Sequence, residues 1–226
     1  MATLTEDLAR FALRVRREDV PDDVVALAKE HLLDTLGVVL ASSRFDFAEV
    51  LHAAVCTLGA GNEATVLGFG TRLPAASAAL VNGTLAHGLD FDDSHIEGIY
   101  KPSAPAASAA FAVAESAGAT GGAFLLAYII GLEIGCRLAA AAPGAFHDRG
   151  WHPTGLCGTF ACAAVAARLA ADPEIALVNA FGLCGSQAGG ILEFGDSWLK
   201  RMHPGWAAQA GLVAAALGRH RPLPGR

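Results

Sequence analysis

Most of the side chains that could do acid–base chemistry lie in three polar stretches of the sequence, at positions 90–103, 147–154 and 193–203. The first contains a run of carboxylates and then Lys101, the second ends with His152 before a proline, and the third contains Lys200 and His203. Each stretch leads into a predicted helix start, where free backbone N–H groups and a nearby cation can hold an anion. If the three helix starts converge, these residues predict a cleft that binds carboxylates and moves protons beside them.

Asp90, Asp92 and Asp93 form an acidic cluster within four positions. Such neighbours repel one another unless they are exposed, cap a helix, bind a cation or share a proton. The simplest alternative is a solvated helix end, just as the lysines and histidines could be ordinary surface or structural residues. A magnesium–diphosphate site usually has a second carboxylate-rich arm, which the sequence lacks, so no metal is expected. The string also matches the acid motif of class II terpene cyclases, but nothing else in the sequence supports that assignment.

The composition favours one large helical domain. Of the 226 residues, 53% are hydrophobic, 17% are charged and 7% are aromatic, and 48 are alanine. Packed sheets draw on β-branched and aromatic side chains, so this alanine excess favours close-packed helices. A chain of this length and composition can bury a large core, which excludes disorder.

Charge, cysteines and hydropathy limit the partners and the location. The net charge of −6 and the pI near 5.7 disfavour nucleic acid as a partner. The five cysteines are odd in number and no secretory leader precedes Thr5, so we expect buried thiols in the cytoplasm. The mean hydropathy is +0.42, but polar or charged residues interrupt the longest apolar runs, which predicts a soluble protein without a membrane partner.

Helix periodicity and helix-end signals predict nine helices. The first follows a cap at Thr5, and the second opens at Pro21 and ends near Ser43. The others are expected at 45–58, 75–89, 104–116, 122–142, 154–171, 173–185 and 204–217, with one strand within 63–70. The helical domain is expected to cover residues 1–218, and residues 219–226 are expected to be a tail or a truncated linker.

Five motifs, in order along the chain, carry a resemblance to a known family. They are HLLDTLG at 31–37, NGTLAHGLDFDDS at 82–94, PSAP at 102–105, GWHPTG at 150–155 and KRMHPG at 200–205. With them the chain resembles the MmgE/PrpD family from about position 8 to 217. This family includes 2-methylcitrate dehydratase, cis-aconitate decarboxylase and iminodisuccinate epimerase.

The resemblance implies a large all-α domain that needs no metal or other cofactor and dimerises through its helices. Position by position, it implies the following roles. The implied catalytic residues are Asp90, Ser94, His152 and Lys200, with Lys200 as a general base or carboxylate anchor. We also expect four residues to bind the substrate, namely Asp93, Lys101, Ser103 and His203.

The chain departs from the family pattern in two places. Lys101 stands where the family commonly has a histidine, and a lysine there can bind a carboxylate but stays protonated near neutral pH unless it is desolvated. Family members also continue into a smaller α/β domain that closes over the cleft, which we expect this chain to lack because it stops at Arg226. A cleft without that domain would be wetter, and its charges would be screened.

The leading hypothesis is a lyase- or isomerase-like enzyme that acts on a small carboxylate. Lys200 or His152 would remove a proton, and Lys101 and the helix starts would hold the anion. Asp90 with Ser94 would orient the substrate or donate a proton to a leaving group. The competing hypothesis is a non-catalytic helical module, or half of a two-chain enzyme whose partner chain supplies the α/β domain. A third is a repurposed biosynthetic catalyst, in which Lys101 and Trp206 reshape the pocket for a less polar substrate.

Overall fold

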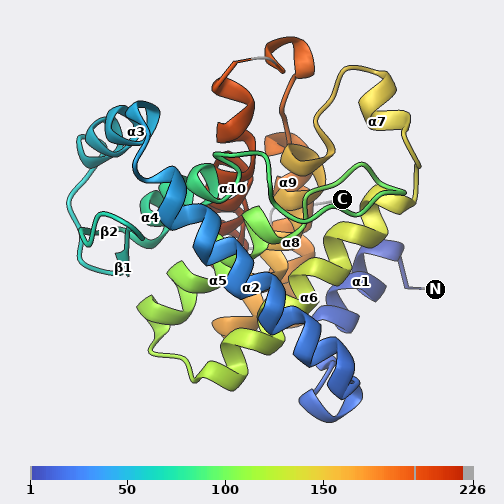
Figure 1. Cartoon of the computed structure of the whole chain (residues 1–226). Coiled ribbons are helices and arrows are strands. Elements are labelled where there is room, and N and C mark those ends of the chain that lie inside the picture. The colour runs from blue at the N-terminus through green and yellow to red at the C-terminus, as the bar shows by residue number, and fades with distance from the viewer. Residues whose placement is uncertain (1, 196, 221–226) are drawn as a thin grey trace.

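The chain folds into an all-α domain, as its composition predicts. The computed structural model describes residues 2–195 and 197–220 (Figure 1). The helices are α1 (Leu4–Arg14), α2 (Asp22–Ser42), α3 (Asp46–Cys56), α4 (Ala75–Ala86), α5 (Ser103–Ala117), α6 (Gly121–Ala140), α7 (Ala145–Asp148), α8 (Pro153–Leu169), α9 (Glu174–Gln187) and α10 (Leu199–His220). Two 3-10 turns, Arg17–Asp19 and Leu192–Phe194, and two short strands, β1 (Ala64–Thr65) and β2 (Arg72–Leu73), complete the described part.

Helix α8 lies at the centre of the bundle and packs against α5, α6, α9 and α10. Small side chains line its buried faces, so the neighbouring axes approach closely. At the crossing of α4 and α10, a Cβ atom on Gly83 would lie 2.6 Å from the Cα of Gly205. Glycine at both positions therefore lets α10 rest directly on α4, and this contact holds the first turns of α10 near the end of α4.

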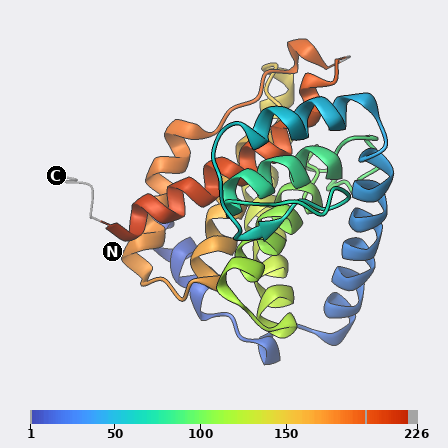
Figure 2. The same cartoon turned by 90° about the vertical axis from the view of Figure 1, so that its left-hand side faces the viewer.

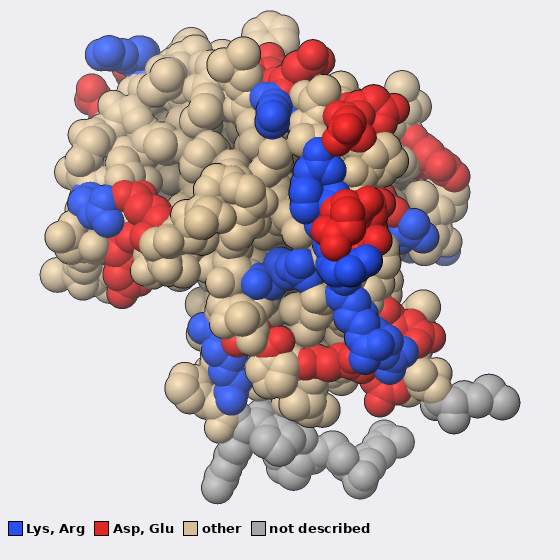
Figure 3. All heavy atoms as spheres, turned by 90° about the horizontal axis from the view of Figure 1, so that it is seen from below, with Lys and Arg blue, Asp and Glu red and all other residues tan. Residues whose placement is uncertain are grey.

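Helix α2 covers one side of the bundle and packs against α4, α5 and α6. Figure 2 shows it along one edge of the molecule. At the opposite side, α1 packs against α9, and Arg10 bonds Glu174 at 3.0 Å. Figure 3 shows acidic and basic side chains interspersed on the face seen from below, beside a broad uncharged area.

Most predicted helix ends lie within three residues of the observed ones, but the start of α10 is five residues earlier than predicted. The prediction used Pro204 as the helix start, and the helix instead begins at Leu199 with Pro204 inside it. The fixed φ of proline fits a helix, and the cost is the missing hydrogen bond to the carbonyl of Lys200. Lys200 and His203 therefore lie on a helix rather than in the loop that was predicted.

Smaller corrections concern the ends of other elements. Helix α1 is capped by Thr3, which forms a capping box with Glu6, rather than by Thr5. Helix α4 ends at Ala86, three residues before the predicted end, because the chain turns so that His87 bonds Asp92. Of the strand expected within 63–70, only Ala64–Thr65 is extended in a ladder, paired with Arg72–Leu73. The short helix α7 was not predicted.

The cysteines are only partly as predicted. Cys157, Cys162 and Cys184 are buried, but Cys56 is exposed, and all five are free thiols. Cys56 is the last residue of α3 and contacts His52 one turn earlier, with Sγ 3.4 Å from Nε2. Burial raises the pKa of Cys157 and Cys184 to about 12, so these thiols stay protonated.

Helix α6 is long and apolar enough to cross a membrane by length and composition, and 44% of its most apolar window is buried within the domain. Its buried side packs against α8, and Arg137 pairs with Glu133 on its exposed side. One such helix is also what the core of a helical protein provides, so this helix is weak support for a membrane span.

The predicted boundary after residue 218 remains a prediction. Helix α10 continues through Arg219 and His220, and Arg219 bonds Asp172 at 2.7 Å. Residues 221–226 of the predicted tail lie outside the described residues.

Candidate functional site

The three polar stretches converge on one cavity of about 320 Å³. Lys101 comes from the loop between α4 and α5, His152 from the residue before α8, and Lys200 from the first turn of α10. The remaining lining residues are Ser94, His95, Ile96, Ile99, His147 and Leu192. Residues far apart in the sequence thus place two ammonium groups and an imidazole around one space.

An ion-pair network fixes the two lysines around Asp90. The Lys200 ammonium donates to Oδ2 of Asp90 at 2.8 Å, and the Lys101 ammonium lies 3.6 Å from Oδ1. Lys101 also donates to the backbone carbonyl of Asp92 at 3.0 Å. Asp90 has a φ of 58°, a left-handed conformation that is uncommon for a residue with a side chain. This strained turn presents its carboxylate to both lysines.

The pKa of Asp90 is lowered by the cations around it. Partial burial alone would raise the pKa of Asp90, but the hydrogen bond from Lys200 and the positive charges of His87, Lys200 and Lys101 hold it below its ordinary value. The carboxylate is therefore ionised near neutral pH. It competes with any incoming anion for the two ammonium groups.

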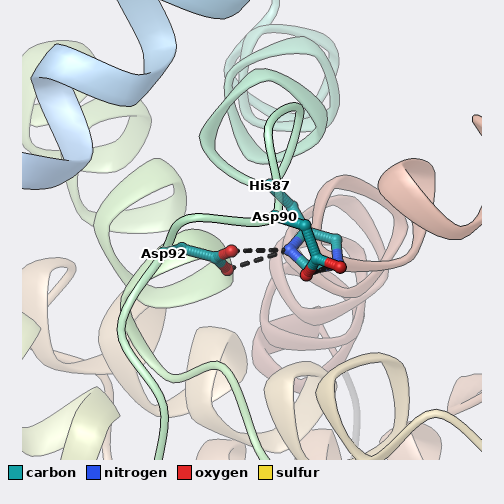
Figure 4. A group of neighbouring side chains, drawn as sticks. All are labelled: His87, Asp90 and Asp92. Carbon is teal, nitrogen blue, oxygen red and sulfur yellow. Dashed lines mark hydrogen bonds and ion pairs between the residues drawn. The ribbon is translucent and has the colours of Figure 1, made fainter.

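Behind Asp90 lies a buried histidine–aspartate pair that the sequence analysis did not assign. Nδ1 of His87 donates to the Asp92 carboxylate at 2.8 Å, and both side chains are buried (Figure 4). Nε2 of His87 is buried without a hydrogen-bond partner among the described residues and lies 3.7 Å from Oδ1 of Asp90. The only sequence signal for this pair was a histidine at the end of a helix, five residues before an aspartate.

His87, Asp90 and Asp92 could also serve as metal ligands, since one atom from each lies within 4.8 Å of the others. However, Lys101 and Lys200 already supply positive charge at Asp90, and Lys101 lies 3.6 Å from the Asp92 carboxylate. The ammonium groups of Lys101 and Lys200 would repel a divalent cation at this point. The donor set therefore fits ion pairs better than a metal.

His152 and His203 form a second pair at the cavity. Their Nδ1 atoms lie 2.9 Å apart, so one ring donates and the other accepts. Burial, together with the charges of His87, His203 and Lys200, lowers the pKa of His152 to about 2, and burial also lowers the pKa of His203. Both rings are neutral near neutral pH. Gly190, at a φ of 131°, leaves room for them, because its Cβ would lie 3.2 Å from the His203 ring.

Two of the predicted substrate-binding residues face the interior instead. Oγ of Ser103 donates to Asp93 at 2.6 Å and contacts the hydroxyl of Tyr128 at 2.5 Å, while His31 lies 3.0 Å from the same carboxylate. Ser103 is fully buried, and burial raises the pKa of Asp93 despite the hydrogen bonds from Ser103. Neither residue lines the cavity in this conformation, and a role in substrate binding stays a prediction for both.

The comparisons with known proteins cover almost the whole chain. A cis-aconitate decarboxylase-like protein, oryM, from Aspergillus oryzae is 30% identical over 96% of this chain and 47% of its own length. Cis-aconitate decarboxylase from Aspergillus terreus is 27% identical over 95% of the chain, and that from Homo sapiens is 29% identical over 96%. The chain thus spans slightly less than half the length of these relatives.

The family comparison agrees with the motifs and with the helical fold. The model of the MmgE/PrpD N-terminal domain matches residues 6–220, which include every element that forms the cavity. The chain therefore belongs to the MmgE/PrpD family.

Proposed function

We propose that this chain is the helical part of a lyase that acts on a small carboxylic acid and moves a proton next to a carboxylate. The observation that carries the proposal is the convergence of Lys101, Lys200 and the neutral His152 on one cavity. Its volume of about 320 Å³ suits a small molecule. The names of the relatives favour decarboxylation over dehydration or epimerisation.

The two lysines would bind the substrate as carboxylate anchors. In the free site their charge is shared with Asp90, which is half exposed at 51%. A substrate carboxylate can take the place of Asp90 beside one ammonium group, because both groups accept the same kind of charged hydrogen bond. Nζ of Lys200 already donates a hydrogen bond to Asp90, so in this arrangement Lys200 would bind negative charge rather than remove a proton.

His152 would take part in proton transfer. Its Nδ1 is occupied by His203, which leaves Nε2 for the substrate. A pKa of about 2 makes His152 a poor base in the free site, but a bound carboxylate beside it stabilises the imidazolium and raises that pKa. In a decarboxylation the bond between carbon and the carboxylate breaks, CO₂ leaves, and the electron pair left on the substrate takes up one proton. His152 would take this proton from solvent once the bound carboxylate has raised its pKa, and would pass it to the substrate carbon as the CO₂ leaves.

The proposal is tested by incubating the purified chain with di- and tricarboxylic acids, including cis-aconitate, in deuterium oxide. We expect release of CO₂, or deuterium at the carbon next to a carboxylate, detected by NMR. Absence of both with every compound, for the chain alone and for the chain with a partner that supplies the α/β domain, would contradict the proposal. We also propose that no metal takes part, so EDTA should leave the rate unchanged.

Three variants locate the activity. Lys200→Ala and His152→Ala are each expected to lower the rate by about a hundredfold or more. Arg201→Ala is the matched control, because it removes a cation from the same helical turn as Lys200. The Arg201 guanidinium lies over the Phe47 ring, 5.1 Å from its centre, and Arg201 does not line the cavity. Full activity in both cavity variants would show that the site lies elsewhere.

The predicted homodimer and the predicted partner chain remain predictions. Light scattering of the purified chain gives its mass in solution, and a monomeric mass would contradict the homodimer. If activity appears only when a separate α/β chain is added, the two-chain hypothesis is supported over a chain that is active alone.

A further inference from the structure

The buried His87–Asp92 pair leaves one ring nitrogen without a partner. Nδ1 of His87 lies 2.8 Å and 2.9 Å from the two carboxylate oxygens of Asp92, and both side chains are fully buried. Nε2 is buried as well and has no hydrogen-bond partner among the described residues. Because an unpaired polar atom in the interior costs free energy, this nitrogen indicates a partner that it binds in another state of the site.

Nε2 of His87 is directed at the Asp90 carboxylate. It lies 3.7 Å from Oδ1 of Asp90, which is longer than a hydrogen bond but short enough for a small rotation of the Asp90 side chain to close. In Figure 4 the carboxylates of Asp92 and Asp90 lie at opposite ends of the ring, one at Nδ1 and one at Nε2. A ring that donates from both nitrogens is an imidazolium, and a carboxylate at each end stabilises that form.

The two lysines hold Asp90 away from this nitrogen. Lys200 donates to Oδ2 of Asp90 at 2.8 Å, and the Lys101 ammonium lies 3.6 Å from Oδ1. Both lysines line the site cavity, whereas the fully buried His87 is not among its described lining residues. A rotation of Asp90 from the lysines toward His87 would therefore carry its carboxylate toward the interior and leave the ammonium groups open to another anion.

We propose that His87, oriented by Asp92, is a positioning residue that donates a hydrogen bond to Asp90 once a substrate carboxylate has displaced Asp90 from the lysines. Without this donor, Asp90 would stay beside Lys200 and Lys101 and compete with the substrate for them. The two carboxylates at the ring thus have different tasks, since Asp92 fixes the ring and Asp90 moves between the lysines and the ring. This inference rests on the proposed function, because it needs a carboxylate to bind at the two lysines.

The first test measures the affinity of the His87→Asn variant for cis-aconitate. Asparagine can still donate to Asp92 but is too short to reach Asp90, so the substitution removes the Nε2 donor and leaves the buried carboxylate paired. The lost hydrogen bond is a charged one, so calorimetry should show a Kd about tenfold higher than that of the parent chain. An unchanged Kd would overturn the inference.

His31→Gln is the matched control for this substitution. His31 also pairs with an aspartate of the acidic loop, since its Nδ1 lies 3.0 Å from the Asp93 carboxylate. It is not among the described residues that line the site cavity. This variant should bind cis-aconitate with the Kd of the parent chain, and an equal loss of affinity in His31→Gln and His87→Asn would overturn a specific role for His87.

A double variant separates positioning from a merely structural role. Asp90→Ala removes the carboxylate that His87 is proposed to bind, so adding His87→Asn to it should change Kd by less than about twofold. A structural defect caused by His87→Asn would instead lower the affinity in both backgrounds. A tenfold loss that persists in the Asp90→Ala background would therefore overturn the inference. Circular dichroism checks that each variant keeps its helical signal.

NMR of the ¹⁵N-labelled His87 ring gives a readout that needs no activity. We expect two ring N–H protons that disappear in His87→Asn, because both nitrogens donate. The proton on Nε2 should shift when cis-aconitate binds, because its hydrogen bond to Asp90 shortens. A single ring N–H, or an Nε2 proton that does not respond to saturating cis-aconitate, would overturn the inference.

The outcomes separate this role of His87 from the proposed function. If the parent chain binds neither cis-aconitate nor succinate, alone or with a partner that supplies the α/β domain, the proposed carboxylate site is contradicted and the inference falls with it. If the parent chain binds cis-aconitate and His87→Asn binds it equally well, only the role of His87 is overturned.

Discussion

Asp90 and Asp93 lie three residues apart in one acidic loop and have opposite surroundings. Asp90 is half exposed and faces two lysines, whereas the side chain of Asp93 is 14% exposed and faces Ser103 and His31. The pKa of Asp90 is lowered by its cationic partners, and that of Asp93 is raised by burial. One acidic motif thus supplies two kinds of carboxylate. Asp90 places a negative charge beside the cavity lysines, and Asp93 forms hydrogen bonds that stabilise the fold.

This difference matters because the hydrogen bonds of Asp93 hold the loop that carries Lys101 in place. Asp93 also accepts from the backbone N–H of Ser103 at 3.1 Å, which ties the loop to the first turn of α5. Lys101 sits two residues before that turn, and its backbone N–H donates to Thr154 in the first turn of α8. Removing the carboxylate at 90 should therefore affect chemistry, and removing the one at 93 should affect stability.

The largest expected effect is on activity in Asp90→Asn. The amide keeps the shape of the side chain but loses the charge that pairs with Lys200 and Lys101, so both ammonium groups are freed and their positions change. We expect kcat to fall by about a hundredfold or more because the lysines lose the partner that positions them, with little change in the free energy of unfolding. Steady-state kinetics and urea unfolding of the same preparation measure both. Full activity of this variant would show that Asp90 has no role in the candidate site.

The next effect is on stability in Asp93→Ala. The substitution leaves the Ser103 hydroxyl and backbone N–H without their acceptor in a mostly buried place, which should lower the free energy of unfolding by about 2 kcal/mol. Urea unfolding followed by circular dichroism measures the loss. Glu115→Ala is a useful control, since Glu115 bonds Thr65 at a more exposed site far from the loop. A larger effect in Asp90→Asn than in Asp93→Ala would invert the comparison between the two aspartates.

The contrast between the two aspartates could not have been predicted from the sequence. Helix caps, glycines and alanine-rich faces predict the helices well, because they act through neighbouring residues. The three polar stretches could be singled out because each leads into a predicted helix start, but their convergence was only a condition of the hypothesis, and the third stretch lies partly within α10. Which carboxylate turns inward depends on the left-handed φ of Asp90 and on the position of Ser103, and both are set by packing rather than by local sequence.

Dependence on distant packing also explains why the sequence did not predict the His87–Asp92 pair or the correct start of α10. His87 reads as a residue at a helix end, and only the fold shows that it is buried against Asp92. Pro204 is a normal helix-start signal, but the contact between Gly83 and Gly205 allows α10 to run past it. Both errors concern residues whose environment comes from segments far away in the chain.

A smaller effect is expected for Tyr128→Phe. Because Ser103 uses its only hydroxyl proton on Asp93, the Tyr128 hydroxyl is the donor in the 2.5 Å contact with Ser103. Phenylalanine removes that one hydrogen bond and keeps the ring in the core, so the free energy of unfolding should fall by about 1 kcal/mol. Activity should not change. Urea unfolding and a rate assay test both parts, and a large loss of activity would connect the interior network to the chemistry.

The smallest expected effect is the pH dependence of stability, where the two aspartates should act in opposite directions. The pKa of Asp93 lies above its ordinary value of 3.8, so between 3.8 and that higher value the folded chain holds more protons than the unfolded chain and stability falls as pH rises. The pKa of Asp90 lies below 3.8, so its contribution is present above 3.8 and is lost as pH falls through its folded value.

The contributions of Asp90 and Asp93 to the pH dependence of stability are both small, because burial raises each pKa while hydrogen bonds and ion pairs lower it. Unfolding free energies of the parent, Asp90→Asn and Asp93→Asn chains between about pH 3 and about pH 6 should separate them. Relative to the parent, Asp93→Asn should make stability rise more steeply with pH, and Asp90→Asn should make it rise less steeply. Slopes that change in the same direction in both variants would show that the two carboxylates share one environment, and the division of the acidic loop into a charged side and an anchoring side would be wrong.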